Sequence, residues 1–403
     1  MLSQQTGSFR HMKSLNRSLI LNTIRRHQAI SRAEIAKETN LTPPTVTNIV
    51  NELIKENMVF ESSAGESKGG RKPILLKIKS DSRFVIGVDI GVSKVRLVVS
   101  DLEASLFERS VLDTPAHLTR TSFLEFITSA LQAFLEELGS KKEKLIGIGV
   151  AMHGIVDHRT GVSIHAPTLG LMNVPVKEHL EQHLQLPVEV SNDAKALAIA
   201  EKWFGAGKAF DNFLCLNIVE GIGSGLIINN ELFHGHHSLA GELGHMPVSQ
   251  EGPLCSCGAE GCLQTFISEN AIQRNMEEKL LAGEGSSLQA SFEKDQTPDM
   301  QLIYQHAAAG DELSKRVFEE AGRYLGLGLT SAIHFMNPPL IILGGSILKY
   351  VDVLLPPMNK VLTGRALTEA AASTKIEISE LGEDGTLKGA CTLILANLFQ
   401  SGN

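Results

Sequence analysis

The sequence predicts an α/β protein in which a small winged helix-turn-helix domain precedes a larger body of two α/β lobes. Three observations indicate this fold class. Apolar residues recur at helical spacing in 14–27, and a helix-capping box follows at Ser31. From residue 84 the pattern changes to short buried strands that alternate with helices. Two strand–glycine turn–strand units, at 84–101 and 213–228, indicate two related lobes with a cleft between them.

Length and charge agree with this division. The 403 residues allow two or three domains, each large enough for a hydrophobic core. Residues 1–80 hold 13 Lys and Arg against 6 Glu, a net charge of +7, whereas the other 323 residues carry −15. A basic head on an acidic body favours a nucleic-acid partner for the head, although the total charge of −8 alone argues against one. We expect the winged domain in 1–80, the first lobe in 81–192 with a C-terminal helix at 389–403, and the second lobe, with a dimerisation surface, in 193–388.

No membrane partner is expected. Hydrophobic residues make up 43% and charged residues 20% of the chain, which is typical of a globular protein. None of its apolar runs reaches the ~18 residues of a membrane-spanning helix. The polar N-terminus is not followed by the apolar stretch of a signal peptide, so we expect a cytoplasmic protein.

Three helices and a tight turn are predicted in the head. The first helix covers 14–27. Ser31 caps the second, Arg32–Thr39, and the glutamate three residues after the cap completes a capping box. Thr42 caps the third, which has proline at its first position and ends near Glu56. Helix, turn and helix in this order are typical of DNA-binding domains. The residues expected to face inward are Ile35, Ala36, Leu41, Val46, Ile49, Val50 and Leu53.

A basic wing is predicted after the third helix. Strands at 58–60 and 74–78 flank a loop, 62–73, whose glycine pair and cations suit the phosphate backbone or the minor groove. The third helix turns small and amide side chains outward, and these can enter a major groove. The alternative is a protein-binding helical module with a solvated basic loop. The residues expected to contact DNA are Ser31, Arg32, Thr42, Pro44, Thr45, Thr47, Asn48, Asn51, Gly70, Arg71 and Lys72.

The body begins with a buried strand at 84–91 that ends in Asp-x-Gly. A helix is expected at about 121–138, and a glycine-rich turn at 221–225. The other expected strands are 95–101, 145–150, 188–190, 213–218, 226–228 and 340–343.

Several short motifs along the chain are typical of one protein family. They are Ser-Arg-Ala-Glu-Ile-Ala at 31–36, Gly-Arg-Lys-Pro at 70–73, Asp-Ile-Gly at 89–91, Asn-Asp-Ala at 192–194, Ala-Gly-Glu-Leu-Gly-His at 240–245, Cys-Ser-Cys-Gly-Ala-Glu-Gly-Cys at 255–262, and Asn-Pro-Pro at 337–339 before Gly-Gly at 344–345. With these motifs the chain resembles the ROK family (repressors, open reading frames, kinases), in its winged-helix, xylose-repressor-like and N-acetylglucosamine-repressor-like branch. The resemblance covers essentially the whole chain, and it implies an actin/hexokinase-like (ribonuclease H-like) body of two lobes that binds a sugar in its cleft.

A structural zinc site is predicted in the second lobe. His245, Cys255, Cys257 and Cys262 give the pattern His-x9-Cys-x-Cys-x4-Cys. A closed set of three thiolates and one imidazole leaves no position for water, which is typical of structural Zn²⁺. The alternative is a group of free reduced thiols. A second histidine cluster, at 234–237, lies in a loop that varies among related proteins, and we do not assign a metal to it.

A sugar site is predicted beside this metal. Asn192 and Asp193 follow a strand, at the carboxyl end where clefts form in α/β folds, and their amide and carboxylate suit adjacent hydroxyl groups. Glu242 and His245 are three residues apart and share a face of a helical turn. One nitrogen of His245 can bind the metal while the other meets a hydroxyl. The resemblance implies sugar contact for Asn192, Asp193, Glu242, His245, Gln264 and Gly154.

Two departures prevent the choice of a particular sugar. Gln264 stands where sugar-phosphorylating relatives usually have a glutamate that touches the sugar. Glutamine keeps the length, loses the charge and gains a donor. Leu171 stands where relatives often have tryptophan.

The phosphate loops argue against kinase activity. Kinases of the family resemble Asp-x-Gly-Gly-Thr-Lys, but here Val92 replaces the second glycine and restricts the close approach of a phosphate. Glu220 stands where a hydroxyl should meet a phosphate, and its charge would repel one. Asp193, the general base in kinase relatives, is therefore expected to be a vestige without a catalytic role.

The function expected from these features is repression of carbohydrate-utilisation genes. Double-stranded operator DNA would bind the winged helices of a dimer, and a small sugar or oligosaccharide inducer would release it. A tetramer in place of the dimer, and a phosphotransferase-system protein in place of or beside the sugar, stay open. The alternative function is an ATP-dependent sugar kinase that also binds DNA.

Overall fold

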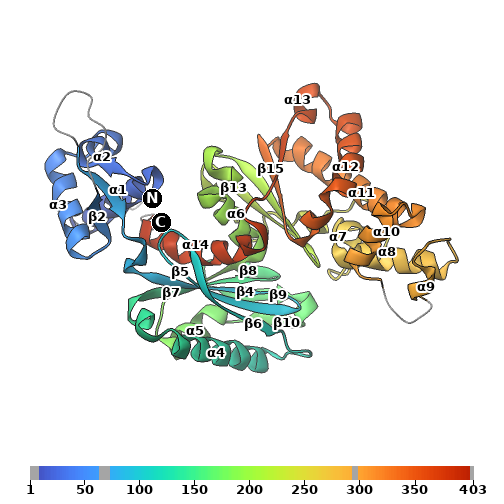
Figure 1. Cartoon of the computed structure of the whole chain (residues 1–403), viewed down its shortest axis with the longest axis horizontal. Coiled ribbons are helices and arrows are strands. Elements are labelled where there is room, and N and C mark those ends of the chain that lie inside the picture. The colour runs from blue at the N-terminus through green and yellow to red at the C-terminus, as the bar shows by residue number, and fades with distance from the viewer. Residues whose placement is uncertain (1–8, 63–72, 293–297, 400–403) are drawn as a thin grey trace, which may run out of the picture.

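The winged domain lies at one end of the molecule, next to the C-terminal helix (Figure 1). The computed structural model describes residues 9–62, 73–292 and 298–399. Three helices pack against a small sheet of strand order β1-β3-β2. Their bounds are α1 (Phe9–His27), α2 (Arg32–Thr39), α3 (Pro43–Lys55), β1 (Ile30–Ser31), β2 (Val59–Ser62) and β3 (Leu75–Ile78).

Local chemistry sets the ends of these helices, as predicted. Ser31 Oγ accepts from the Glu34 amide at 3.3 Å, and the Glu34 carboxylate accepts from the Ser31 amide at 2.9 Å, which completes the capping box. Thr42 Oγ1 accepts from the Thr45 amide at 3.4 Å. The expected inward residues are buried, with Ala36 and Leu41 only partly so. Residues 63–72, most of the predicted wing, lie outside the described residues.

The first lobe is a five-stranded sheet of order β11-β7-β4-β5-β6. Helices α4 and α5 cover one face, and the C-terminal helix α14 covers the other (Figure 1). A small sheet, β10-β9-β8, extends the lobe. The bounds are β4 (Phe84–Ile90), β5 (Lys94–Ser100), β6 (Leu106–Asp113), α4 (Arg120–Glu137), β7 (Leu145–Met152), β8 (Ile155–Asp157), β9 (Val162–Ala166), β10 (Leu171–Val174), α5 (Val176–Leu184), β11 (Val188–Asn192) and α14 (Gly385–Phe399).

The second lobe repeats this plan with a sheet of order β14-β13-β12-β15-β16. In each lobe an antiparallel pair, β4–β5 or β12–β13, is joined by a parallel neighbour, β7 or β15. The bounds are α6 (Asp193–Phe204), β12 (Phe213–Ile218), β13 (Ile222–Ile228), β14 (Glu231–Leu232), α7 (Gln264–Ile267), α8 (Glu269–Leu281), α9 (Gln289–Phe292), α10 (Met300–Ala308), α11 (Glu312–Met336), β15 (Leu340–Gly344), α12 (Val351–Arg365), α13 (Glu369–Ala372) and β16 (Lys375–Ile378).

Helices α6 and α14 pack against each other between the two sheets (Figure 1). Glycines allow the close approach. A Cβ atom at Gly389 would come within 2.1 Å of the Ala196 carbonyl oxygen, and one at Gly149 within 1.8 Å of the Ala390 carbonyl oxygen. The two lobes therefore meet through a tightly packed helix pair.

The structure differs from the expectations at the C-terminal helix and in several strands. The C-terminal helix begins at Gly385 rather than at residue 389. The edge strands β6 and β16 and the small sheet β8–β10 were not predicted, because short, half-exposed strands carry little apolar periodicity. We keep the division of the body at residue 192, between β11 and α6, as an interpretation.

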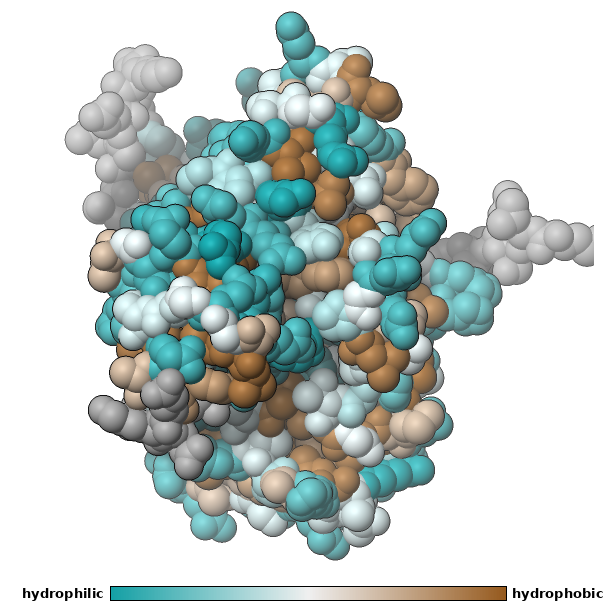
Figure 2. All heavy atoms as spheres, turned by 90° about the vertical axis from the view of Figure 1, so that its right-hand side faces the viewer, coloured by the Kyte–Doolittle hydropathy of each residue, from teal (hydrophilic) through white to brown (hydrophobic). Residues whose placement is uncertain are grey.

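The end of the molecule formed by the second lobe presents a largely hydrophilic surface with separate apolar patches (Figure 2). Phe335 and Leu367 are the most exposed large apolar side chains among the described residues, at 89% and 80%. None of the described helices combines the length and hydropathy that crossing a lipid bilayer requires.

Candidate functional site

One cavity between the lobes, of about 490 Å³, brings together all the residues for which sugar contact was predicted. They come from both lobes, at the ends of strands and at helix starts. Around it also lie Val92, His153, Ile155, His165, Pro167 and Glu220. The predicted members are Gly154, Asn192, Asp193, Glu242, His245 and Gln264.

Asn192 positions its neighbours. Its Oδ1 accepts from the amides of Ala194 and Lys195, at 3.0 and 3.1 Å, and so caps α6. Its Nδ2 donates to the Gly154 carbonyl oxygen at 2.9 Å and to Asp193 Oδ1 at 2.8 Å. The amide group of Asn192 is thus largely engaged within the protein, and it holds Asp193 toward the cavity.

Asp193 is the best-placed acceptor in the cavity. Among the described residues, its side-chain hydrogen bonds use Oδ1, which leaves Oδ2 for a ligand. Burial raises the pKa of Asp193, while the neighbouring His153 acts in the opposite direction. A partly buried carboxylate with a free oxygen can accept hydrogen bonds from the hydroxyl groups of a polyol.

Glu242 and His245 lie on one short turn, as predicted. Residues Leu243–His245 form a single 3₁₀ turn, and the His245 amide donates to the Glu242 carbonyl oxygen at 3.1 Å. Burial raises the pKa of Glu242, and the ammonium group of Lys195 opposes that rise. Lys195 is itself buried and donates to the Ser238 carbonyl oxygen. The partly buried Glu242 carboxyl group therefore lies in the cavity wall and interacts electrostatically with Lys195.

The four predicted metal ligands meet at one point. The Nδ1 atom of His245 lies 3.5 Å from Cys255 Sγ, Cys257 Sγ lies 3.7 Å from Cys262 Sγ, and all four donor atoms lie within 4.8 Å of one another. Tetrahedral zinc with bonds of ~2.3 Å to sulfur separates its ligand atoms by roughly 3.5–4 Å. The donor set and its spacing therefore fit a metal ion of this type.

Gln264 links the metal ligands to the cavity. Its Nε2 donates to Cys255 Sγ at 3.1 Å and lies 3.4 Å from Ser256 Oγ. Its Oε1 faces the cavity wall at Gly221, where an added Cβ would lie 3.5 Å away. A glutamate could not donate to a thiolate, so the glutamine at this position has a physical reason.

Two histidines of the cavity were missed in the sequence. His153 and His165 line the cavity, and His153 interacts electrostatically with Asp193. His153 could have been found, since it directly precedes Gly154. His165 lies on the unpredicted strand β9, so nothing in the sequence indicated it. Leu171, by contrast, is 1% exposed in the core of the first lobe and does not line the cavity.

An adjoining cavity, of about 230 Å³, occupies the place of the phosphate loops and is lined by Val92, Glu220 and Asp89. Ser93 Oγ donates to Glu220 Oε1 at 3.2 Å, which joins the two loops across the cleft. Arg96 donates to Asp89 Oδ2 at 2.9 Å and to the Glu383 carbonyl oxygen at 2.7 Å. The protein's own side chains thus engage two acidic groups of this cavity, Glu220 and Asp89.

The residues predicted to contact DNA differ in their exposure to solvent. Thr42, Pro44, Thr47, Asn48 and Asn51 are exposed, and Arg32 and Thr45 are partly so. Ser31 is 7% exposed and its hydroxyl belongs to the capping box, so its burial argues against the predicted DNA contact. Gly70, Arg71 and Lys72 lie outside the described residues.

Known proteins resemble both parts of the chain. Residues 85–397 match the family model "ROK family", and residues 14–59 match "Winged helix-turn-helix DNA-binding". The xylose repressor of Bacillus subtilis is 31% identical over 95% of this chain and 96% of its own length. The regulator NagC of Escherichia coli is 29% identical over 97% of this chain and 94% of its own length.

Solved structures agree with these sequence matches. A ROK family transcriptional regulator, described as a homolog of the Escherichia coli MLC protein, superposes with a TM-score of 0.86 and 26% identity, over 97% of this chain and 98% of its own. A ROK family glucokinase of Streptomyces griseus, in complex with glucose and AMPPNP, superposes with a TM-score of 0.66 and 29% identity, over 77% of this chain and 98% of its own. The chain belongs to the ROK family, and it carries a winged helix-turn-helix domain at its N-terminal end.

Proposed function

We propose that the chain is a DNA-binding transcriptional repressor of carbohydrate-utilisation genes, and that a sugar bound between its lobes releases it from DNA. The observation that carries this proposal is the coexistence, in one chain, of a winged helix-turn-helix domain and a cavity lined by Asn192, Asp193, Glu242 and His245. The names of the similar repressors support it. Xylose and N-acetylglucosamine, which those names mention, are the first sugars to test.

Operator DNA is the proposed partner of the head. The exposed α3 side chains, with Arg32, would enter the major groove, and Arg71 and Lys72 of the wing would contact phosphates. We further propose a homo-oligomer, so that two winged domains face a palindromic operator in the cytoplasm, where the chromosome lies. The exposed Phe335 and Leu367 of the second lobe support an interface there. A tetramer and a phosphotransferase-system partner stay open.

Zn²⁺ is the proposed metal of the cluster formed by His245, Cys255, Cys257 and Cys262. When bound, it would supply structural cross-linking rather than reaction chemistry, because the ligand set is closed. His245 would bind through Nδ1, the nitrogen that lies 3.5 Å from Cys255 Sγ. Its Nε2 would then be available for a sugar hydroxyl, and Gln264 would donate to the bound thiolate.

We propose that the chain is not a sugar kinase. The alternative would need a phosphate site, but Glu220 and Ser93 are bonded to each other there and Arg96 is engaged with Asp89. A coupled assay tests this directly. Sugar-dependent ATP turnover at ordinary enzyme rates would overturn the repressor-only proposal.

The decisive experiment measures operator binding with and without sugar. Duplexes selected from a random pool by the wild-type chain serve as probes, together with DNA upstream of its own gene. Fluorescence anisotropy at fixed salt then gives the operator Kd alone and with saturating D-xylose, N-acetylglucosamine or D-glucose. We expect one of these sugars to weaken binding about tenfold or more. If the chain binds no duplex, or if no sugar changes its affinity, the proposed function fails.

A further inference from the structure

Helix α6 touches both the proposed sugar cavity and the winged domain. Its N-cap residue Asn192 and its first residue Asp193 line the cavity. Its last turn carries Trp203 and Phe204, which line a second, larger cavity between the body and the winged domain. Ten residues of α-helix separate Asp193 from Trp203, a length of about 15 Å. The same helix therefore has one end at each of the two sites that a repressor must couple.

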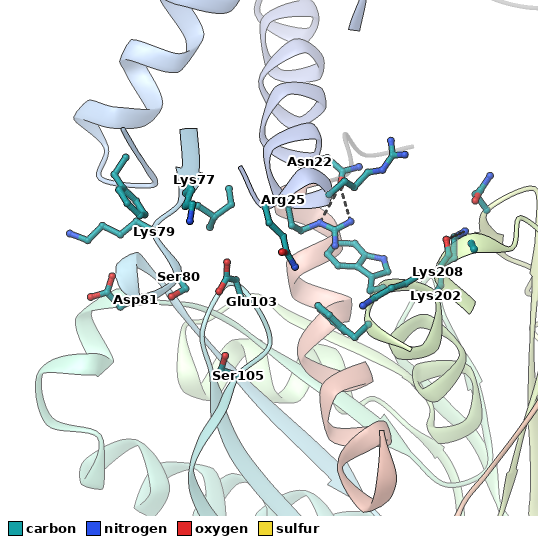
Figure 3. Close-up of a pocket in the computed structure, with 18 of the residues that line it drawn as sticks. Asn22, Arg25, Lys77, Lys79, Ser80, Asp81, Glu103, Ser105, Lys202 and Lys208 are labelled. Atoms are coloured by element: carbon teal, nitrogen blue, oxygen red, sulfur yellow. Dashed lines mark hydrogen bonds between the residues drawn. The ribbon is translucent and has the colours of Figure 1, made fainter. Parts of the chain in front are cut away.

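The far end of α6 meets the winged domain through Arg25 of α1. The Arg25 guanidinium lies 3.8 Å from the centre of the Trp203 ring and 5.6 Å from that of Phe399. Arg25 also donates to Asn22 Oδ1 at 3.1 and 2.9 Å, which fixes its orientation. Figure 3 shows Asn22 and Arg25 at the end of α1, with Lys202 and Lys208 on the wall of the body.

Burial strengthens this contact. Trp203 is 8% exposed, and desolvation lowers the pKa of Arg25 to about 10. The cation–π attraction between a guanidinium and an indole is stronger when water is removed from both groups. A cavity of about 1730 Å³ separates the two parts on one side of this contact. On the other side they share one apolar cluster. Within this cluster α1 also contacts α14.

Between its two ends, α6 cannot readily bend. Ala194, Ala196, Ala198 and Ala200 are buried against neighbouring elements. A Cβ atom at Gly225 of β13 would come within 2.5 Å of the Ala198 Cβ, so no space remains on that side. A helix packed this closely shifts as a unit rather than deforming gradually.

We propose that α6 couples the sugar cavity to the winged domain, with the Arg25–Trp203 stack as the contact that transmits its movement. Sugar bound at Asp193 would shift the first turn of α6, and the last turn would then change its stacking on Arg25 and the orientation of α1. This inference rests on the proposed function. Arg25 and Trp203 act as positioning residues, since Trp203 lies at the opposite end of α6 from the cavity and Arg25 faces the body.

The chain carries its own optical probe for this movement. Trp203 is the sole tryptophan in the sequence. Titration with the sugar that weakens operator binding should change the intrinsic fluorescence of the wild-type chain, in the absence of DNA. The change should follow the same Kd as calorimetry. Calorimetric binding without any change in Trp203 emission would count against movement at this end of α6.

The coupling itself is measured with Arg25→Gln, which removes the cation and keeps much of the size. Four constants are needed: the operator Kd with and without sugar, and the sugar Kd with and without operator. In the wild-type chain each ligand changes the Kd of the other by a certain factor. We expect Arg25→Gln to reduce that factor about tenfold toward unity. The reduction should be equal for the operator and for the sugar, because linkage is reciprocal. The sugar Kd of the free protein should stay within about twofold of the wild-type value.

Arg26→Gln is the matched control. Arg26 neighbours Arg25, carries the same charge and is exposed, with its guanidinium 3.6 Å from Glu38. Its loss should leave both factors unchanged. Arg25→Lys, which keeps the charge but not the planar stack, should give an intermediate factor and serves as the second variant if Arg25→Gln unfolds. A wild-type chain without any sugar response overturns the proposed function. A wild-type response that Arg25→Gln and Arg25→Lys retain in full overturns only the role of α6.

Discussion

Two neighbouring cavities between the same lobes have opposite character. In the proposed sugar cavity, Asp193 keeps an oxygen free and Gln264 and His245 face the space with polar groups. In the adjoining cavity, Ser93 is bonded to Glu220, and Arg96 to Asp89. Asp193 and Glu220 line both cavities, but Gln264 and His245 line only the first, and the mutually bonded Arg96 and Asp89 line only the second. A fold that resembles a sugar kinase can thus carry the proposed sugar cavity beside a region in which the protein's own side chains engage Glu220 and Asp89.

Removing the free carboxylate should have the largest effect. Asp193→Ala should weaken sugar binding about 100-fold, because charge-assisted hydrogen bonds to hydroxyls are lost. Operator affinity without sugar should stay within about twofold. Calorimetry and anisotropy measure the two constants. Ser93→Ala, in the adjoining cavity, is the control and should leave sugar affinity unchanged. Equal loss in both variants would remove the distinction between the cavities.

Breaking the Arg96–Asp89 pair in the adjoining cavity should lower the free energy of unfolding and leave sugar affinity unchanged. Arg96→Met leaves the buried Asp89 without its cation, and we expect the free energy of unfolding to fall by about 2 kcal/mol. Burial already raises the pKa of Asp89, so the loss should shrink as the pH falls and this carboxylate is protonated. Urea unfolding at several pH values measures it.

An exposed pair of the same chemistry provides the control. Arg109 donates to both carboxylate oxygens of Asp384, at 2.7 and 2.8 Å, but near the surface. Arg109→Met should cost less than about 1 kcal/mol. A similar cost for both variants would show that burial of Asp89 is irrelevant.

Loss of the proposed metal site should weaken sugar binding but not operator binding. Cys257→Ser should lose its Zn²⁺, seen by metal analysis of the purified chain, and weaken sugar binding about tenfold through His245 and Gln264. Operator affinity should be unchanged, since the winged domain lies elsewhere. Cys215→Ser, in the buried strand β12, controls for general loss of a thiol. Loss of operator affinity in folded Cys257→Ser chain would contradict this separation.

A smaller effect is expected where the lobes touch beside the cavity. His158 and His234, one from each lobe, stack with ring centres 3.7 Å apart, near Lys195, Arg159 and Asp157. Burial, and then the neighbouring His158, lower the pKa of His234 from 6.5 to about 4. Between pH 6.5 and about 4, His234 binds a proton in the unfolded chain but not in the folded chain. The free energy of unfolding therefore falls as the pH drops through this range.

Comparison with His234→Gln isolates this contribution. The wild-type free energy of unfolding should fall more steeply than that of the variant between pH 6.5 and 4.5, by less than about 1 kcal/mol per pH unit because the rings are partly exposed. Parallel curves would mean that His234 titrates normally.

The sequence predicts those features that depend on neighbouring residues. The caps at Ser31 and Thr42 and the metal ligands within 245–262 follow from short spacings, and their geometry is as expected. The bond between Ser93 and Glu220 joins residues 127 positions apart, and the stack of Arg25 on Trp203 joins two domains. Such contacts depend on how whole elements pack, which no local pattern specifies. His165 was missed for the same reason, since strand β9 reaches the cavity only through the fold of the small sheet.

The position of α14 has a consequence for synthesis. This helix covers one face of the first-lobe sheet and closes against Gly149, yet residues 385–399 leave the ribosome after the entire second lobe. Until α14 is synthesised, one face of β4 and β7 stays exposed. The residues of the winged domain, by contrast, are synthesised first. The DNA-reading part can therefore form early, and the first lobe completes its core only when α14 arrives. Translation that stops before residue 385 should yield a chain with an exposed apolar sheet, prone to aggregation and to removal by proteases.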